Sequence, residues 1–124
     1  MENEENREQE ELTFESWHKD ICEQREKALE IQNEETRSYF FVRITNRILE
    51  RLKCAESGEE NAACIGLLQS LLEKTGDGAL IDSLILQTGI SVYEERNFPL
   101  AEQLFRFGAN YGNQSAQNNL AYML

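Results

Sequence analysis

The chain has 124 residues, of which 40% are hydrophobic, a size and composition that suit one soluble domain with a real core. Its formal net charge is −11, from 23 acidic side chains against 12 Lys and Arg, and residues 1–35 alone hold thirteen acidic and four basic side chains. Because phosphate backbones and anionic membranes carry the same sign, we expect neither direct nucleic-acid binding nor membrane binding.

The N-terminal third predicts a polar lead-in followed by helix. Residues 1–11 are almost entirely polar and acidic, and we expect them to be disordered. Thr13 is placed to act as an N-cap, and Leu12 and Trp17 have the spacing of a hydrophobic staple. Apolar residues then fall mainly on one helical face: Phe14, Trp17, Ile21, Ala28 and Ile31. Asn33 either caps a second helix or lies inside one continuous helix, and the sequence leaves both interpretations open.

The middle of the chain predicts three helical segments. The first, about 36–55, is amphipathic, and its apolar positions recur at three- and four-residue steps: Phe41, Ile44, Ile48 and Leu52. Ser57 begins a capping-box sequence that opens the next helix. Gly76 can end that helix in the left-handed C-cap conformation. Asp77 can then cap a third segment that runs to about Arg96.

The C-terminal part predicts two short helices. Asn97-Phe98-Pro99 is a turn followed by a helix start, since Pro is tolerated in the first helical turn. That helix ends at Tyr111-Gly112, and Asn113 caps a last helix. We find no convincing strand. The segments therefore predict that residues 12–124 form one all-α domain of stacked antiparallel helical hairpins.

Small residues recur in this C-terminal part at intervals that let two helices approach closely: Ala101, Gly108, Ala109, Gly112, Ala116 and Ala121. The pattern resembles the Sel-like repeats of the tetratricopeptide superfamily. The matching positions are Leu104, Phe105, Gly108, Ala109, Gly112, Ala116 and Leu120. Ala121 stands where that family usually has Gly.

A second resemblance, to the tetratricopeptide repeat itself, overlaps the first. It rests on the spacing of Gly89, Phe98, Ala101, Phe105 and Gly108, with Val92 where that family usually has Tyr. Together the two resemblances cover residues 82–124. They imply an α-α superhelix, preceded here by long N-terminal helices, and a role in holding other proteins.

The sequence contains no recognisable catalytic or metal-binding motif. His18 is the only histidine, and Cys22 lies one helical turn after it, but no oxyanion donor or orienting third group is evident. The three cysteines, completed by Cys54 and Cys64, lack metal-type and redox-type spacing. We therefore expect no enzymatic activity, no cofactor and no metal. Without a signal peptide or a spanning apolar run, we expect a cytoplasmic protein with reduced thiols.

Two groups of residues are candidates for partner binding. Arg43, Arg47 and Arg51 form a basic row along one helix, which is an anion-binding ridge, a set of ion pairs with acidic side chains, or a docking site for an acidic partner segment. A second group comprises Gln103, Arg106, Phe107 and Tyr111. If exposed, its aromatic pair is typical of a protein-recognition hot spot, and otherwise it packs on a neighbouring helix.

These observations lead to one main hypothesis and two alternatives. The main hypothesis is a non-catalytic protein–protein interaction module or adaptor that binds a peptide or helix of a partner in a groove of the helical repeat. An alternative is a small acidic inhibitor or antitoxin-like protein whose N-terminal acidic helix blocks a basic site on a target. A second alternative is an oligomerisation scaffold in which the long N-terminal helices self-associate. The apolar last helix, residues 114–124, also suggests a homo-oligomer or a larger repeat array.

Overall fold

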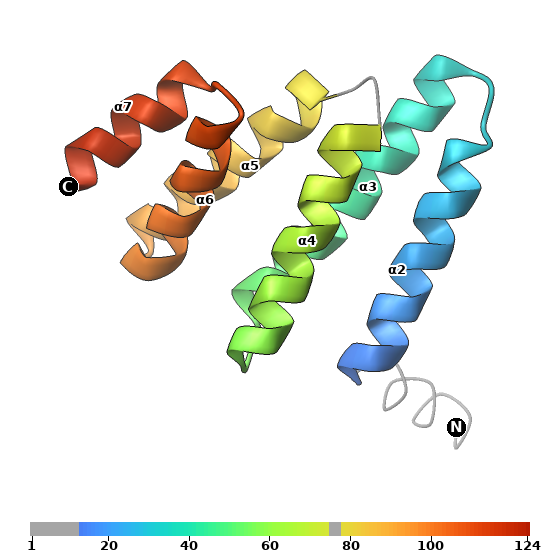
Figure 1. Cartoon of the computed structure of the whole chain (residues 1–124), viewed down its shortest axis with the longest axis horizontal. Coiled ribbons are helices and arrows are strands. Elements are labelled where there is room, and N and C mark those ends of the chain that lie inside the picture. Colours follow the sequence, from blue (N-terminus) through green and yellow to red (C-terminus); the bar gives the residue numbers. More distant parts are fainter. Residues whose placement is uncertain (1–12, 75–77) are drawn as a thin grey trace.

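The computed structural model describes residues 13–74 and 78–124, and within these ranges every regular element is an α-helix (Figure 1). The helices are α2 (Phe14–Leu29), α3 (Glu34–Lys53), α4 (Gly58–Lys74), α5 (Gly78–Glu94), α6 (Phe98–Asn110) and α7 (Gln114–Met123). The predicted all-α fold is therefore confirmed. The predicted lead-in, the staple residue Leu12, and the caps at Gly76 and Asp77 lie outside the described residues.

Successive helices run in alternate directions through the molecule. Figure 1 shows α2, α4 and α6 toward the viewer and α3 and α5 behind them, with α7 at one end. Helix α3 contacts α2, α4 and α5, while the most extensive contacts join α6 to its two chain neighbours, α5 and α7. The stack of antiparallel hairpins predicted from the sequence is thus confirmed.

One apolar cluster runs through the stack. Its buried members come from every helix between α2 and α6, and Leu120 and Met123 of α7 pack against it. The largest of its fully buried aliphatic and aromatic side chains are Ile21, Phe41, Ile44, Ile48, Leu68, Leu71, Ile81, Ile85 and Leu104. Since no single hairpin supplies both sides of this core, each depends on its neighbours for burial.

Side-chain caps set where several helices begin. Thr13 Oγ1 accepts a hydrogen bond from Ser16 N at 3.4 Å, and Asn33 Oδ1 accepts one from Thr36 N at 2.9 Å. Asn33 therefore caps a new helix, and α2 and α3 are two separate helices. Of the two interpretations of this region, the structure has the capped second helix.

The links after α5 and after α6 have the same geometry. Arg96 (φ 67°) and Gly112 (φ 85°) both occupy the left-handed region. The following amides close each link, because Asn97 N donates to Val92 O at 2.8 Å and Asn113 N donates to Gly108 O at 3.0 Å. Each is a Schellman-type helix end followed at once by an N-capping Asn. The helix end and the cap of the next helix are thus formed by the same hydrogen bonds in both links.

Small residues lie where these helices cross. A β-carbon built on Gly89 of α5 would stand 2.8 Å from Cε1 of Phe105, and one built on Gly108 of α6 would stand 2.9 Å from the β-carbon of Ala116. Ala101 is completely buried. The small-residue spacing seen in the sequence therefore has a steric cause in the α5–α6 and α6–α7 contacts.

In the part of the chain that the structure describes, no helix is both long enough and apolar enough to cross a membrane.

Candidate partner-binding site

A hollow between α2 and α3, which we call the α2–α3 groove, has a volume of about 560 Å³. The residues that line it are Gln24, Lys27, Ala28, Ile31, Phe40, Arg43, Ile44 and Arg47. They come from the second half of α2, from Ile31 in the link after α2, and from the middle of α3.

The floor of the groove is apolar. Ala28 and Ile44 belong to the core cluster and are each 2% exposed, and Ile31 packs against that cluster. Phe40 is 37% exposed and lies at the edge of the groove, beside Tyr39, whose ring meets it edge-on at 5.8 Å between centroids. The groove thus exposes apolar surface that is continuous with the core.

Three cations surround this floor, and they have different partners. Arg47 Nη1 donates to Asp20 Oδ2 at 3.1 Å, and the same oxygen accepts from Gln24 Nε2 at 3.1 Å. The Arg43 guanidinium lies 5.8 Å from the centroid of the Tyr39 ring. Within residues 13–74 and 78–124, neither Arg43 nor Lys27 forms an ion pair. The rim therefore keeps positive charge on its accessible side.

The predicted arginine row divides between two environments. Arg43 and Arg47 line the groove, whereas Arg51 lies 5.6 Å from the ring centroids of both Phe14 and Trp17, near the start of α2. Arg51 thus covers aromatic surface at the other end of the helix pair. The predicted pairing with an acidic side chain of the N-terminal helix is confirmed for Arg47.

The second predicted group, on α6, is largely occupied within the fold. Gln103 exchanges two hydrogen bonds with Asn61 of α4, at 2.6 and 3.0 Å. Arg106 pairs with Glu102 at 2.9 Å on the exposed side of α6. These two side chains therefore serve the α4–α6 contact and the helix surface.

The two aromatic residues of that group differ in how exposed they are. Phe107 is 8% exposed and belongs to the core cluster, as the packing alternative predicts, whereas Tyr111 is 42% exposed. Their ring centroids are 5.2 Å apart. Only Tyr111 offers an aromatic surface to a partner here.

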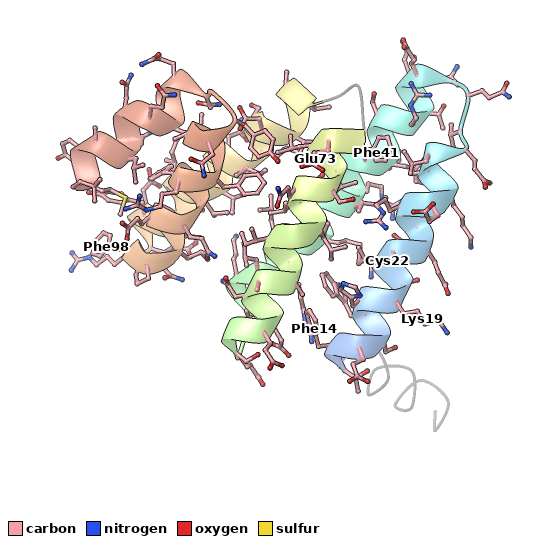
Figure 2. The ribbon with its side chains drawn as sticks, in the orientation of Figure 1. Phe14, Lys19, Cys22, Phe41, Glu73 and Phe98 are labelled. Carbon is pink, nitrogen blue, oxygen red and sulfur yellow. The ribbon has the colours of Figure 1, made fainter. Side chains whose placement is uncertain are left out.

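Sequence reasoning missed Lys27, Tyr39 and Phe40. A signal for the aromatic residues is present, since Tyr39, Phe40 and Phe41 are consecutive in a helix and point about 100° apart, so they cannot all enter one core. Phe41, at 1% exposed, takes the buried position. Figure 2 shows Phe41 inside the stack and Lys19 projecting away from it on α2.

The histidine and cysteine side chains form no recognisable catalytic or metal-binding group among the described residues. Cys22 Sγ lies 3.8 Å from His18 Nδ1 on the same helix, as their spacing predicts. Among the described residues no group of three His, Cys, Asp or Glu side chains is placed to hold a metal ion. Burial raises the pKa of the Cys64 thiol to about 11, which makes it a poor nucleophile.

The last helix leaves apolar side chains in contact with solvent. Ala116 is buried against Gly108, but Tyr122 and Leu124 are 82% and 78% exposed. Self-association through residues 114–124 stays a prediction, which a mass measurement in solution would check.

Comparison of the chain with protein-family models, with curated protein sequences and with solved structures finds no match.

Proposed function

We propose that this chain is a non-catalytic protein–protein interaction module that holds a segment of a partner protein in the α2–α3 groove. The observation that carries the proposal is the groove itself, in which an apolar floor of Ala28, Ile31 and Ile44, with Phe40 at its edge, lies inside a polar rim. Interface centres have this anatomy, with apolar or aromatic anchors surrounded by polar groups. Its volume is within the range of about 300–1,000 Å³ that is usual for binding pockets.

The fold and the family resemblance support the same function. Stacked hairpins present extended surfaces between their helices, and such surfaces are used to hold other proteins. The close crossings at Gly89 and Gly108 are at the positions on which the Sel-like and tetratricopeptide resemblances rest. We place the protein in the cytoplasm, where its three free cysteines would stay reduced.

Photo-crosslinking tests the proposal. A benzophenone amino acid placed at Phe40, on the edge of the groove, is expected to join the chain to a partner protein in cells. The matched control carries the same group at Tyr122, which is 82% exposed and lies on α7, away from the groove. Adducts at position 40 and not at position 122 support the groove. Adducts that are equal at both positions, or absent from position 40, argue against it.

The acidic-inhibitor alternative has one observation in its favour. The exposed outer side of α2 carries four carboxylates, those of Glu15, Glu23, Glu26 and Glu30. A truncation of residues 1–35 cannot test this cleanly, because α2 contributes the buried Trp17, Ile21 and Ala28 to the core. Replacing the four glutamates with Gln keeps the helix. Partner crosslinking at position 40 that survives this change supports the groove, and its loss favours the inhibitor.

A further inference from the structure

We infer that the α2–α3 groove selects an acidic amphipathic segment of its partner, and this inference rests on the proposed function. Apolar side chains of that segment would cover Ile31, Phe40 and Ile44. Carboxylates beside them would pair with Lys27 and Arg43.

The charge of the groove contrasts with that of the whole chain. The chain has a net charge of −11, yet three cations converge on this one hollow. Asp20 neutralises Arg47, which leaves Lys27 and Arg43 to attract a ligand. An Arg guanidinium binds a carboxylate through two parallel hydrogen bonds, and a Lys ammonium supplies a mobile point charge. A partner that brings carboxylates therefore gains pairs that a neutral partner lacks.

The apolar floor separates an amphipathic segment from other anions. A phosphate group or a nucleic-acid backbone would meet the cations but would leave Ile31 and Phe40 uncovered. The exposed Glu23 and Glu26 lie on the same helix as Lys27, and the exposed Glu30 is the C-cap of that helix. Their charges repel a long polyanion, whereas a short segment with a few carboxylates can avoid them.

The dimensions of the groove suit a short segment. Its lining residues extend from Gln24 on α2 to Ile31 in the following link, and from Phe40 to Arg47 on α3. At about 1.5 Å per residue, the α3 side is about 10 Å long, or roughly two helical turns. Apolar side chains three or four positions apart on a partner helix have the matching separation. A partner segment with two apolar anchors and flanking carboxylates therefore fits.

Three synthetic helical peptides test the inference by fluorescence anisotropy. All carry two Leu anchors four positions apart, and the flanking residues are Glu, Gln or Lys. The Glu peptide is expected to bind the full-length chain about three- to twentyfold more tightly than the Gln peptide, from two exposed charge pairs. The Lys peptide is expected to bind more weakly than either.

Charge reversal then places the effect in the groove. The double variant Lys27→Glu/Arg43→Glu is expected to lose its preference for the Glu peptide and to favour the Lys peptide. The control is Lys19→Glu, which reverses an exposed cation of the same helix that points away from the stack (Figure 2). It is expected to leave the order of the three peptides unchanged. Circular dichroism checks that each variant keeps its helical content.

The peptide measurements separate a failure of this inference from a failure of the proposed interaction module. Equal binding of the Glu and Gln peptides contradicts the inference and leaves the interaction module standing. Binding of none of the peptides by the folded chain contradicts both. Tighter binding of heparin, single-stranded RNA or phosphatidylserine vesicles than of the Glu peptide would show a general anion site and would also overturn the inference.

Discussion

Gly89 of α5 lies against the face of α6 that carries Phe105, so closely that a β-carbon at position 89 would stand 2.8 Å from Cε1 of that ring. Phe105 is 2% exposed and is held in the core cluster. Its ring therefore has little room to move away. The contact sets how near α5 and α6 approach, and with it the geometry of the hairpin.

Substituting Gly89 with Ala should destabilise the protein by about 1–3 kcal/mol, because overpacking a core outweighs the gain in helix propensity. Gly66 of α4 provides the matched control, since a β-carbon there would meet nothing within 4 Å. Gly66→Ala should stabilise the protein by up to about 1 kcal/mol. Urea unfolding followed by circular dichroism measures both changes. A Gly89→Ala variant as stable as Gly66→Ala would contradict the close crossing.

The two equivalent links should respond in opposite directions. Arg96 occupies the left-handed region at φ 67°, which costs an L-residue about 1 kcal/mol or more. Arg96→Gly should therefore raise the free energy of unfolding by about 0.5–1 kcal/mol. Gly112 has φ 85°, so Gly112→Ala should lower that free energy by about 1 kcal/mol. Thermal melts of the two variants check the signs, and a loss of stability in Arg96→Gly would contradict the described link.

More of the fold than of the candidate site could be predicted from the sequence. The caps at Thr13 and Asn113 and the small residues near the C-terminus are local signals, and local hydrogen bonds and steric fit settle them. The break before Asn33 could not be decided, because Asn followed by Glu is compatible with both a cap and a helix interior. Packing between α2 and α3 resolves it, and packing is not visible in one segment of sequence.

The candidate site could be predicted only in part. Arg43 and Arg47 follow from their spacing on one helix, but Lys27 belongs to another helix and joins them only through the hairpin. Phe107 illustrates the converse, since the sequence left open whether it is exposed or packed on a neighbouring helix, and in the structure it is only 8% exposed. Which cations keep free charge also depends on partners such as Asp20, 27 positions away from Arg47 along the chain.

Phe107 and Tyr111 should therefore differ in their effect on stability. Truncating the buried Phe107 to Ala should cost about 3–5 kcal/mol through lost burial and a cavity. Tyr111→Ala should cost less, roughly 1 kcal/mol, because that ring is 42% exposed. Guanidinium unfolding curves of the two variants give the comparison. Equal losses would show that Phe107 does not lie in the core.

The cysteines should react in the order of their exposure. At about pH 8, a maleimide should modify the exposed Cys54 first and Cys64 only after unfolding, because the Cys64 thiol is buried. Burial raises the Cys64 pKa from 9.0 to about 11. The folded state thus holds that proton more tightly than the unfolded state, and stability falls as pH rises from 9 toward 11.

Mass spectrometry of the labelled chain gives the order, and urea unfolding on both sides of this pH interval gives the slope. Cys64→Ala is the control, and its unfolding free energy should fall less over the same interval. A native-state reaction of Cys64 as fast as that of Cys54 would contradict its burial.

The most direct measurement of the central claim is the affinity of the Glu-flanked peptide for Phe40→Ala, compared with wild type and with Tyr122→Ala. Phe40 forms the exposed aromatic edge of the α2–α3 groove, so its truncation should weaken binding about tenfold. Tyr122→Ala removes a more exposed aromatic ring on α7, away from the groove, and should bind like wild type. Wild-type affinity in a correctly folded Phe40→Ala variant would contradict the account.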